Sequence, residues 1–375
     1  MVRLNHFHRG YLAIFLSITS AFAGVIPFSN PINFTSENSF LYIHTQAFYA
    51  NDAFSINTRL NKLHGTQDIQ NGKNNEIIDI RLDSGYFFKD FGYVGYVYRE
   101  ESFVSMSQGM AKLYYNVRNK IDLERGENYQ LALEADASKM QGILYANSFK
   151  LTLAEDFKIY IGGAVELLIA SKMQRWSMYG DAQAIGKKDY DYNVVSDNYY
   201  TKNYLYKLQV PKSEATGYSS HLALKIEYKK LIITFLIDDL IGKLYWENLP
   251  YSYVKAKTDN RTYDENGYVK FQPSISGIEK LLDYTQTLEH KLELDINYSF
   301  DVSQVLLGCD YIYDNYLPYL EYRYNWSSNF STKVGYETRF NSYYTEVQYK
   351  KHFLGVRIDS LEEQKNVSLN IGISF

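Results

Sequence analysis

The second half of this sequence is dominated by a strict alternation of apolar and polar side chains. Between residues 292 and 300, Leu, Ile, Tyr and Phe occupy every second position, while Glu, Asp, Asn and Ser occupy the others. The same division recurs at 320–326, at 330–340 and, earlier in the chain, at 222–229. A period of two residues is typical of a β-strand with one apolar and one polar face, so strands are predicted here.

The connections between these segments are too short for anything other than hairpin turns. They consist of a few residues at 300–302, 314–315, 327–328 and 341–342. Strands joined in this way are antiparallel neighbours. The chain from Lys291 to Phe375 is therefore predicted to be an up-and-down meander, and weaker alternation at 76–83, 129–137 and 158–169 extends the pattern toward the N-terminal half.

The first residues have the composition of a secretory signal peptide. Arg3 and Arg9 give a basic start, and a short apolar run follows from Tyr11 to Thr19. Ala21-Phe22-Ala23 places small residues where a signal peptidase requires them, which predicts cleavage before Gly24. An uncleaved helical anchor is the alternative, although the apolar run is shorter than the roughly 20 residues that a spanning helix needs.

We therefore expect residues 1–23 to be a signal peptide and residues 24–375 to form one exported domain. The chain has only six prolines, no Gly/Ser linker and no block of like charge that could mark a domain boundary. Cys309 is the single cysteine, so disulfides cannot stabilise the fold. A formal net charge of −4 argues against nucleic acid as the main partner. No sequence feature predicts a cofactor.

Past the signal peptide, no stretch is long and apolar enough to cross a bilayer as a helix. The longest candidate, Leu231 to Ile237, runs directly into Asp238 and Asp239. The chain nevertheless contains 38 tyrosines. Amphipathic rings in such numbers suit the two interfaces of a membrane, although soluble β-proteins can also be rich in tyrosine.

The C-terminus carries the strongest resemblance to a known class. Five apolar residues alternate up to the terminal phenylalanine: Val367, Leu369, Ile371, Ile373 and Phe375. With the signal peptide and the meander, this ending resembles the outer-membrane β-barrel proteins of Gram-negative bacteria. The resemblance implies an outer-membrane location, contact with outer-membrane lipids, and recognition of the last strand by the barrel-assembly machinery.

A sheet in hydrocarbon must close on itself, because each unpaired backbone group there costs several kcal/mol. We therefore predict an all-β fold, a closed antiparallel up-and-down transmembrane barrel of about 14 strands, within a range of about 12 to 18. A soluble β-sandwich would show the same alternation and is the competing fold.

Two segments interrupt the alternation, Arg175 to Ser219 and Lys257 to Thr287, and are predicted to be long polar loops on one rim opposite short turns on the other. Ser276 and Glu279 form a capping box, which predicts a short helix in the second loop. That helix could decorate the outside of the barrel or fold into the lumen.

A search for catalytic and metal-binding patterns leaves only isolated candidates, and we expect a non-enzymatic protein without a bound metal. Asp238 and Asp239 could share a proton or bind a cation, although strand-end acids more often face solvent. His290 could act as a general base but is interpreted as an ordinary rim residue. The oxygen-rich group Asp189, Asp191 and Asp197 lacks the spacing of a calcium loop.

The polar strand faces predict a lumen of mixed charge, which favours a general polar pore over a selective ion filter. The candidate lumen-lining residues are Lys225, Glu227, Lys229, Glu293, Asp295, Glu321, Arg323, Lys333, Glu337, Arg339 and Glu346. The leading hypothesis is a passive channel or uptake pore for small solutes. The alternative is a non-enzymatic binding or structural barrel that presents Tyr/Asp-rich loops to a partner. The solute and the oligomeric state are not predicted.

Overall fold

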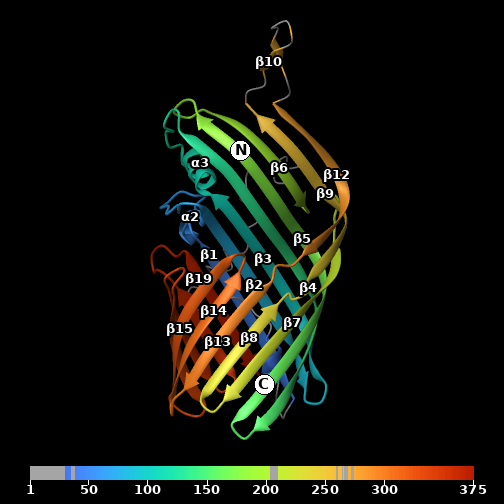
Figure 1. Ribbon diagram of the computed structural model, residues 1–375, viewed down its shortest axis with the longest axis vertical. Coiled ribbons are helices and arrows are strands. Elements are labelled where there is room, and N and C mark those ends of the chain that lie inside the picture. Colours follow the sequence, from blue (N-terminus) through green and yellow to red (C-terminus); the bar gives the residue numbers. More distant parts are fainter. Residues whose placement is uncertain are drawn as a thin grey trace.

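A computed structural model describes residues 30–34, 39–202, 210–258, 261–263, 265, 269–271 and 274–375 (Figure 1). The predicted signal peptide, residues 1–23, and its cleavage site before Gly24 lie outside the described residues. The elements, in chain order, have the following bounds. They are η1 Pro31–Phe34, β1 Phe40–Asn51, α2 Ile56–Leu60, β2 Lys73–Phe88, β3 Gly92–Ser107, α3 Gln108–Asn119, β4 Asn128–Ala154, β5 Phe157–Ala184, β6 Tyr190–Tyr200, β7 Ala215–Tyr228, β8 Leu231–Asp238, β9 Lys243–Lys257, β10 Arg261–Tyr263, β11 Val269–Phe271, β12 Ile275–Thr287, β13 Lys291–Ser299, β14 Ser303–Ile312, β15 Asn315–Asn325, β16 Phe330–Glu337, β17 Ser342–Tyr349, β18 His352–Ile358 and β19 Asn366–Ser374.

The strands close into a ring. Antiparallel pairing runs from β1 through β2, β3, β4 and β5 to β7, β8 and β13, and then in chain order to β19. β19 pairs with β1 from Tyr42↔Ser374 to Ala50↔Asn366, which completes the ring. The closed antiparallel barrel predicted from the alternation is therefore confirmed, and two stacked sheets are excluded.

Three further strands extend the wall above one side of this ring. The second half of β5 pairs with β6, β6 pairs with β9, and β9 pairs with β12. In Figure 1 these strands form the upper part of the molecule, and β10 stands above them. We call the opposite end, where the turns between β4 and β5, β7 and β8, and β17 and β18 lie, the lower rim.

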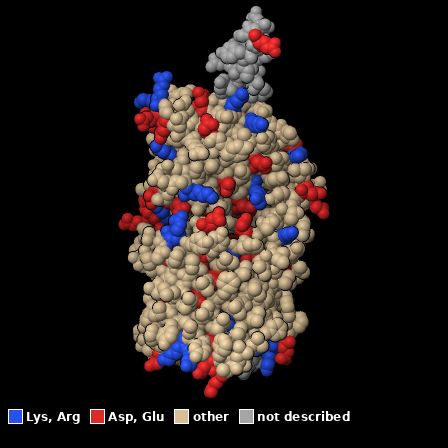
Figure 2. Space-filling model, viewed as in Figure 1, with Lys and Arg blue, Asp and Glu red and all other residues tan. Residues whose placement is uncertain are grey.

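The outer surface of the ring is an apolar belt. Exposed positions include Val165, Leu167, Ile296, Leu307 and Leu320. Ring pairs bound this zone: Tyr298–Phe300 and Tyr324–Trp326 lie near the lower rim, and Tyr311–Tyr316 and Tyr336–Tyr343 lie near the upper turns. Two aromatic girdles around an aliphatic band are typical of transmembrane barrels. On the face shown in Figure 2, charged residues gather at the lower end and at about half height, with a mostly uncharged zone between.

The belt ends along β5 at a bulge. Below the bulge, the exposed residues on the outer face of β5 are apolar from Ile161 to Ile169. At the bulge the β4–β5 register shifts, and Ser171 has no partner on β4. The alternation therefore changes face: above the bulge Arg175 pairs with Asp136 on the lumen side, and the outer face is covered by α3, whose Ala111 and Tyr115 pack with Leu133 and Trp176. Among the described residues, no helix is long and apolar enough to cross a membrane.

Several predictions about strands and loops need correction. The main sheet of the described residues has 17 strands, above the central expectation of about 14 but within the expected range of about 12 to 18. The difference arises because the two predicted long loops are largely strands: Arg175 to Ser219 contains the end of β5, β6 and the start of β7, and Lys257 to Thr287 contains β12. These strands lack the strict alternation that identified the others: on β12, for example, the exposed apolar residues Ile275, Ile278 and Leu281 are three positions apart.

The helix predicted from Ser276 and Glu279 is also wrong. Both residues lie in β12, where they pair with Lys255 and Ser252 of β9. The backbone of this segment is bound to a neighbouring strand, and a local capping pattern does not outweigh those hydrogen bonds. The expected contrast between a rim of short turns and a rim of long loops is not confirmed either, since only Tyr313 and Asp314 connect β14 to β15 at the upper end of the ring.

Candidate functional site: the bridged lumen

A group of buried charged residues crosses the interior of the ring. We call it the lumen ion network; its members are Asp79, Arg81, Asp83, Arg99, Glu101, Glu166, His221, Asp238, Asp239 and Lys291, each at most 5% exposed. Arg81 donates to Glu166 at 2.5 Å and to Asp83 at 2.9 Å. Charges buried in this way are tolerated only when they are paired, and these residues are paired with one another.

Arg99 ties β3 to two places farther along the ring, through Glu166 and Asp239. Arg99 reaches Glu101 at 2.6 Å, Glu166 at 2.9 Å and Asp239 at 2.5 Å. His221 lies between two carboxylates, with its Nε2 3.1 Å from Glu166 and its Nδ1 3.0 Å from Asp238. The network therefore joins β2, β3, β5, β7 and the end of β8.

Lys291 extends the network to the opposite wall. Its Nζ lies 2.5 Å from Asp79 Oδ2 and 2.8 Å from Glu101 Oε1. Lys291 is on β13 and Asp79 is on β2, and β3, β4, β5, β7 and β8 separate these strands along the ring. The ion pair therefore bridges the lumen rather than linking neighbours in the sheet.

An apolar layer bridges the lumen above the ion network. Phe48, Ile77, Ile312, Leu317 and Phe340 are buried in one cluster, and we call this group the mouth layer. The ring of Tyr313 stacks on that of Phe103, with centroids 4.7 Å apart and planes 7° from parallel. Asn75 on β2 donates to Asn315 at 3.1 Å. Residues from β1 to β3 thus contact the hairpin tips of β14–β15 and β16–β17.

The backbone conformation of one turn and the side-chain hydrogen bonds of the other fix the positions of these two hairpin tips. Tyr313 and Asp314 have positive φ values of 46° and 61°, as a two-residue hairpin of the I′ kind requires. In the β16–β17 connection, Glu337 accepts the Phe340 amide at 3.1 Å and the Ser342 hydroxyl at 3.1 Å, and it also accepts the Arg339 amide. The carboxylate therefore fixes the loop that carries Phe340 into the mouth layer.

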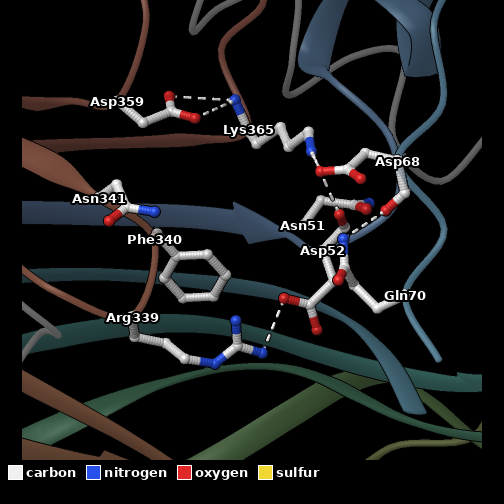
Figure 3. A pocket seen from close by; sticks show the side chains of 9 residues that line it. All are labelled: Asn51, Asp52, Asp68, Gln70, Arg339, Phe340, Asn341, Asp359 and Lys365. Atoms are coloured by element: carbon white, nitrogen blue, oxygen red, sulfur yellow. Dashed lines mark hydrogen bonds and ion pairs between the residues drawn. The ribbon is translucent and has the colours of Figure 1, made fainter. Parts of the chain in front are cut away.

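A polar pocket of about 360 Å³ lies directly over Phe340 (Figure 3). On one side Arg339 pairs with Asp52 at 2.7 Å, and on the other Lys365 pairs with Asp68 at 2.5 Å. The Asp359 carboxylate accepts the backbone amide of Lys365, and its burial raises its pKa. The pocket thus presents both signs of charge above an aromatic floor.

The lower lumen holds many of the predicted lining residues. Lys333 pairs with Glu321 at 2.9 Å, and Arg323 pairs with Glu346 at 3.0 Å, around a small cavity of about 50 Å³. Asp295 accepts from Tyr319 at 2.6 Å. Glu293 is half-buried on the same face of β13 as Asp295, opposite the exposed Leu294 and Ile296.

The remaining predicted residues lie nearer the rims. Lys225 and Glu227, on the same inward face of β7 as the buried Ala223, form a partly exposed pair at 2.6 Å near its lower end. Lys229 is exposed in the β7–β8 turn, and Arg339 is in the β16–β17 connection, so neither is on a strand face. Glu337 is buried but supports the turn at Phe340 instead of lining open space.

Sequence reasoning missed most of the lumen ion network. A signal was present in β2, where Asp79, Arg81 and Asp83 alternate with Ile78, Ile80 and Leu82. The interpretation of Asp238 and Asp239 as solvent-facing strand ends is wrong, because both are fully buried and lie against His221 and Arg99.

The other isolated candidates form no recognisable centre. His290 Nδ1 lies 2.6 Å from the Asp239 carbonyl oxygen. Asp191 and Asp197 lie on β6, and Asp189 precedes that strand. Within the described part of the chain, no group of three or more His, Cys, Asp or Glu residues is arranged to hold a metal ion.

Comparison with known proteins finds similarity in structure alone. No protein-family model matches the chain, and no curated protein matches it in sequence. It is similar to a deltaS2S3 mutant of the monoaromatic hydrocarbon channel TodX, with 10% identity, a TM-score of 0.44 and 92% of each chain covered. The toluene transporter TodX of Pseudomonas putida gives 10% identity and a TM-score of 0.39, covering 95% of this chain and 94% of that chain. A FadL homologue of Pseudomonas aeruginosa gives 9% identity and a TM-score of 0.22, with the same coverage. Because these scores are low, the barrel is established by the closed strand ladder of the chain itself.

Proposed function

We propose that this chain is an outer-membrane channel for uptake of small solutes, whose lumen is closed at rest and opens by movement of the β16–β17 tip. The observation that supports the proposal is the double bridge across the lumen, charged below and apolar above. The apolar belt supports a position of the ring in the bilayer, with the upper wall, whose outer face is covered by α3, outside it. By the usual orientation of such barrels, the lower rim faces the periplasm.

The tip is suited to move because few contacts hold it from above. Arg339 is about one-third exposed, whereas its partner Asp52, which follows β1, is 2% exposed. Solvent therefore reaches this ion pair from the Arg339 side. Release of Arg339 would free Phe340 to leave the mouth layer, and the pocket above would then join the lumen.

The two bridges in series also suggest a class of solute. A molecule entering from above meets the charged pocket, then the aromatic mouth layer, and then the ion network. Small solutes with an apolar body and a polar group could exchange contacts at each level, whereas a bare ion would lose its hydration at the apolar layer.

Single-channel recording in planar bilayers tests the proposal. We expect the wild-type protein to be closed most of the time and Arg339→Gln or Asp52→Asn to increase the open fraction several-fold. Lys187→Gln, at the distant β5–β6 turn, is the matched control and should behave as wild type. Traces that stay closed in all of these variants would contradict the channel and favour the alternative, a non-conducting barrel that binds a partner through its upper wall.

A further inference from the structure

Two hairpin turns at the lower rim carry the same three residues. β7 ends on Tyr228 and continues into Lys229-Lys230, and β17 ends on Tyr349 and continues into Lys350-Lys351. In both, the tyrosine pairs with the residue after the second lysine, so each turn has the same length. Along the ring the two turns are separated by β13 to β16 on one side and by β19 and β1 to β5 on the other.

The backbone of these turns does not favour lysine. Lys229 and Lys350 have φ values of 53° and 55°, in the left-handed region. The first position of such a hairpin turn favours Gly, Asn or Asp, because a Cβ atom is strained there. Each conformation is held by a neighbouring turn, since the Lys229 amide donates to the Asp156 carbonyl at 3.0 Å and the Lys350 amide to the Asn329 carbonyl at 2.6 Å. The backbone geometry therefore does not account for lysine at the first position of these turns. We attribute its presence there to contacts made by the lysine side chain.

The side chains are arranged alike in the two turns. Lys229 Nζ lies 5.4 Å from the centroid of the Tyr228 ring, and Lys350 Nζ lies 5.4 Å from that of Tyr349. Both rings are about half exposed, at 51% and 54%, at the lower edge of the apolar belt. Each ring therefore holds an ammonium group at the level where the belt ends.

The charged groups around the turns leave these amines available. Lys230 pairs with Asp301 at 3.2 Å, and both side chains are exposed. Lys351 Nζ lies 4.9 Å from the centroid of the Phe40 ring. In the part of the chain that the structure describes, no ion pair to a carboxylate is formed by Lys229, Lys350 or Lys351.

We propose that the two Tyr-Lys-Lys turns are binding sites for the phosphate groups of anionic phospholipids in the leaflet at the lower rim. This inference rests on the membrane location proposed above. Lysines that extend from interfacial aromatic residues reach the headgroup region, where an anionic phosphate is the matching partner. Because the turns lie on opposite sides of the ring, together they would fix the depth and tilt of the barrel in the bilayer.

Fluorescence quenching by brominated lipids can test this directly. Trp326 is 63% exposed in the β15–β16 connection at the same rim, whereas Trp176 and Trp246 are 7% and 1% exposed and should contribute a constant background. The protein would be reconstituted in phosphatidylcholine vesicles containing brominated phosphatidylglycerol or brominated phosphatidylcholine. The measured quantity is the ratio of quenching by the two lipids. We expect the wild type to prefer phosphatidylglycerol several-fold and to lose the preference in high salt.

Two variants and a control decide the outcome. Replacing Lys229, Lys230, Lys350 and Lys351 with Gln should bring the ratio close to one. Lys229→Gly with Lys350→Gly should lower the ratio clearly while leaving the melting temperature unchanged or higher, since Gly suits the turn. This pair keeps the test valid if the fourfold variant fails to fold. The Lys187→Gln, Lys188→Gln pair, a lysine doublet at the β5–β6 turn, should leave the ratio unchanged.

An unchanged ratio in both lower-rim variants, or an equal loss in the control pair, would overturn the inference while leaving the membrane location intact. Absence of Trp326 quenching by either lipid would overturn the membrane location, and this inference with it.

Discussion

Lys291 shows how a single side chain can join opposite walls of a barrel. Its ammonium group is buried between Asp79 and Glu101, and Arg99 also contacts Glu101 at 2.6 Å. Sequence reasoning did not assign Lys291 a role, because it stands at the beginning of a strand and its partners lie more than a hundred residues away. Alternation identifies which residues share a face, but it does not identify which of them meet across a lumen.

Removing the Lys291 charge alone should be costly. Lys291→Met leaves the Asp79 carboxylate buried without its cation, and we expect a loss of about 3–5 kcal/mol in the free energy of unfolding. The double variant Asp79→Asn, Lys291→Met should recover most of this loss, because Glu101 keeps Arg99. Urea unfolding in vesicles measures both. Lys225→Met, whose partner Glu227 is partly exposed, is the control and should cost about 1 kcal/mol or less.

An equal loss in the single and double variants would contradict this account. It would mean that Lys291 stabilises the barrel by packing rather than by compensating the Asp79 charge.

At the scale of elements, the strands that carry an apolar outer face were predictable and the others were not. The alternation predicted the strands of the C-terminal meander, including β13, β15 and β16, because each exposes aliphatic side chains on one face. β6, β9 and β12 were missed because they stand above the belt and their apolar residues do not recur at every second position throughout each strand. The mouth layer was missed for a related reason: it is built from hairpin tips, which the sequence indicates only as turns.

The last strand offers a test of closure at this scale. Deleting residues 366–375 removes β19 and leaves the edges of β1 and β18 unpaired. Unpaired backbone groups in hydrocarbon cost several kcal/mol each, so we expect no heat-modifiable, protease-resistant barrel in vesicles.

Phe375→Ala is the matched control for the deletion. Phe375 is largely exposed beyond the end of β19, so its loss should slow assembly if the terminal aromatic residue is read by the assembly machinery, and it should leave the folded barrel as stable as wild type. A deletion variant that still forms a resistant barrel would contradict closure through β19.

For the whole molecule, the composition of the outer surface supports the proposed position of the barrel in a membrane. The ring exposes a continuous aliphatic band between two aromatic girdles, and above it α2 and α3 pack against the wall. The class of fold was therefore predictable from the sequence. The bridged lumen and the tall upper wall depend on contacts between distant strands, which a periodic pattern does not specify.

The most direct test of a ring inserted up to the bulge at Ser171 compares nitroxide spin labels on its outer face below and above that point. In a Cys309→Ser background, labels at Val165 and Ile169 of β5, and at the exposed Lys112 and Lys120 of the α3 region that covers the outer wall above the bulge, would be compared for collisions with oxygen, which concentrates in lipid, and with a water-soluble nickel chelate. We predict high oxygen and low nickel accessibility at Val165 and Ile169, and the reverse at Lys112 and Lys120. Nickel accessibility that is equally high at all four positions would contradict this prediction.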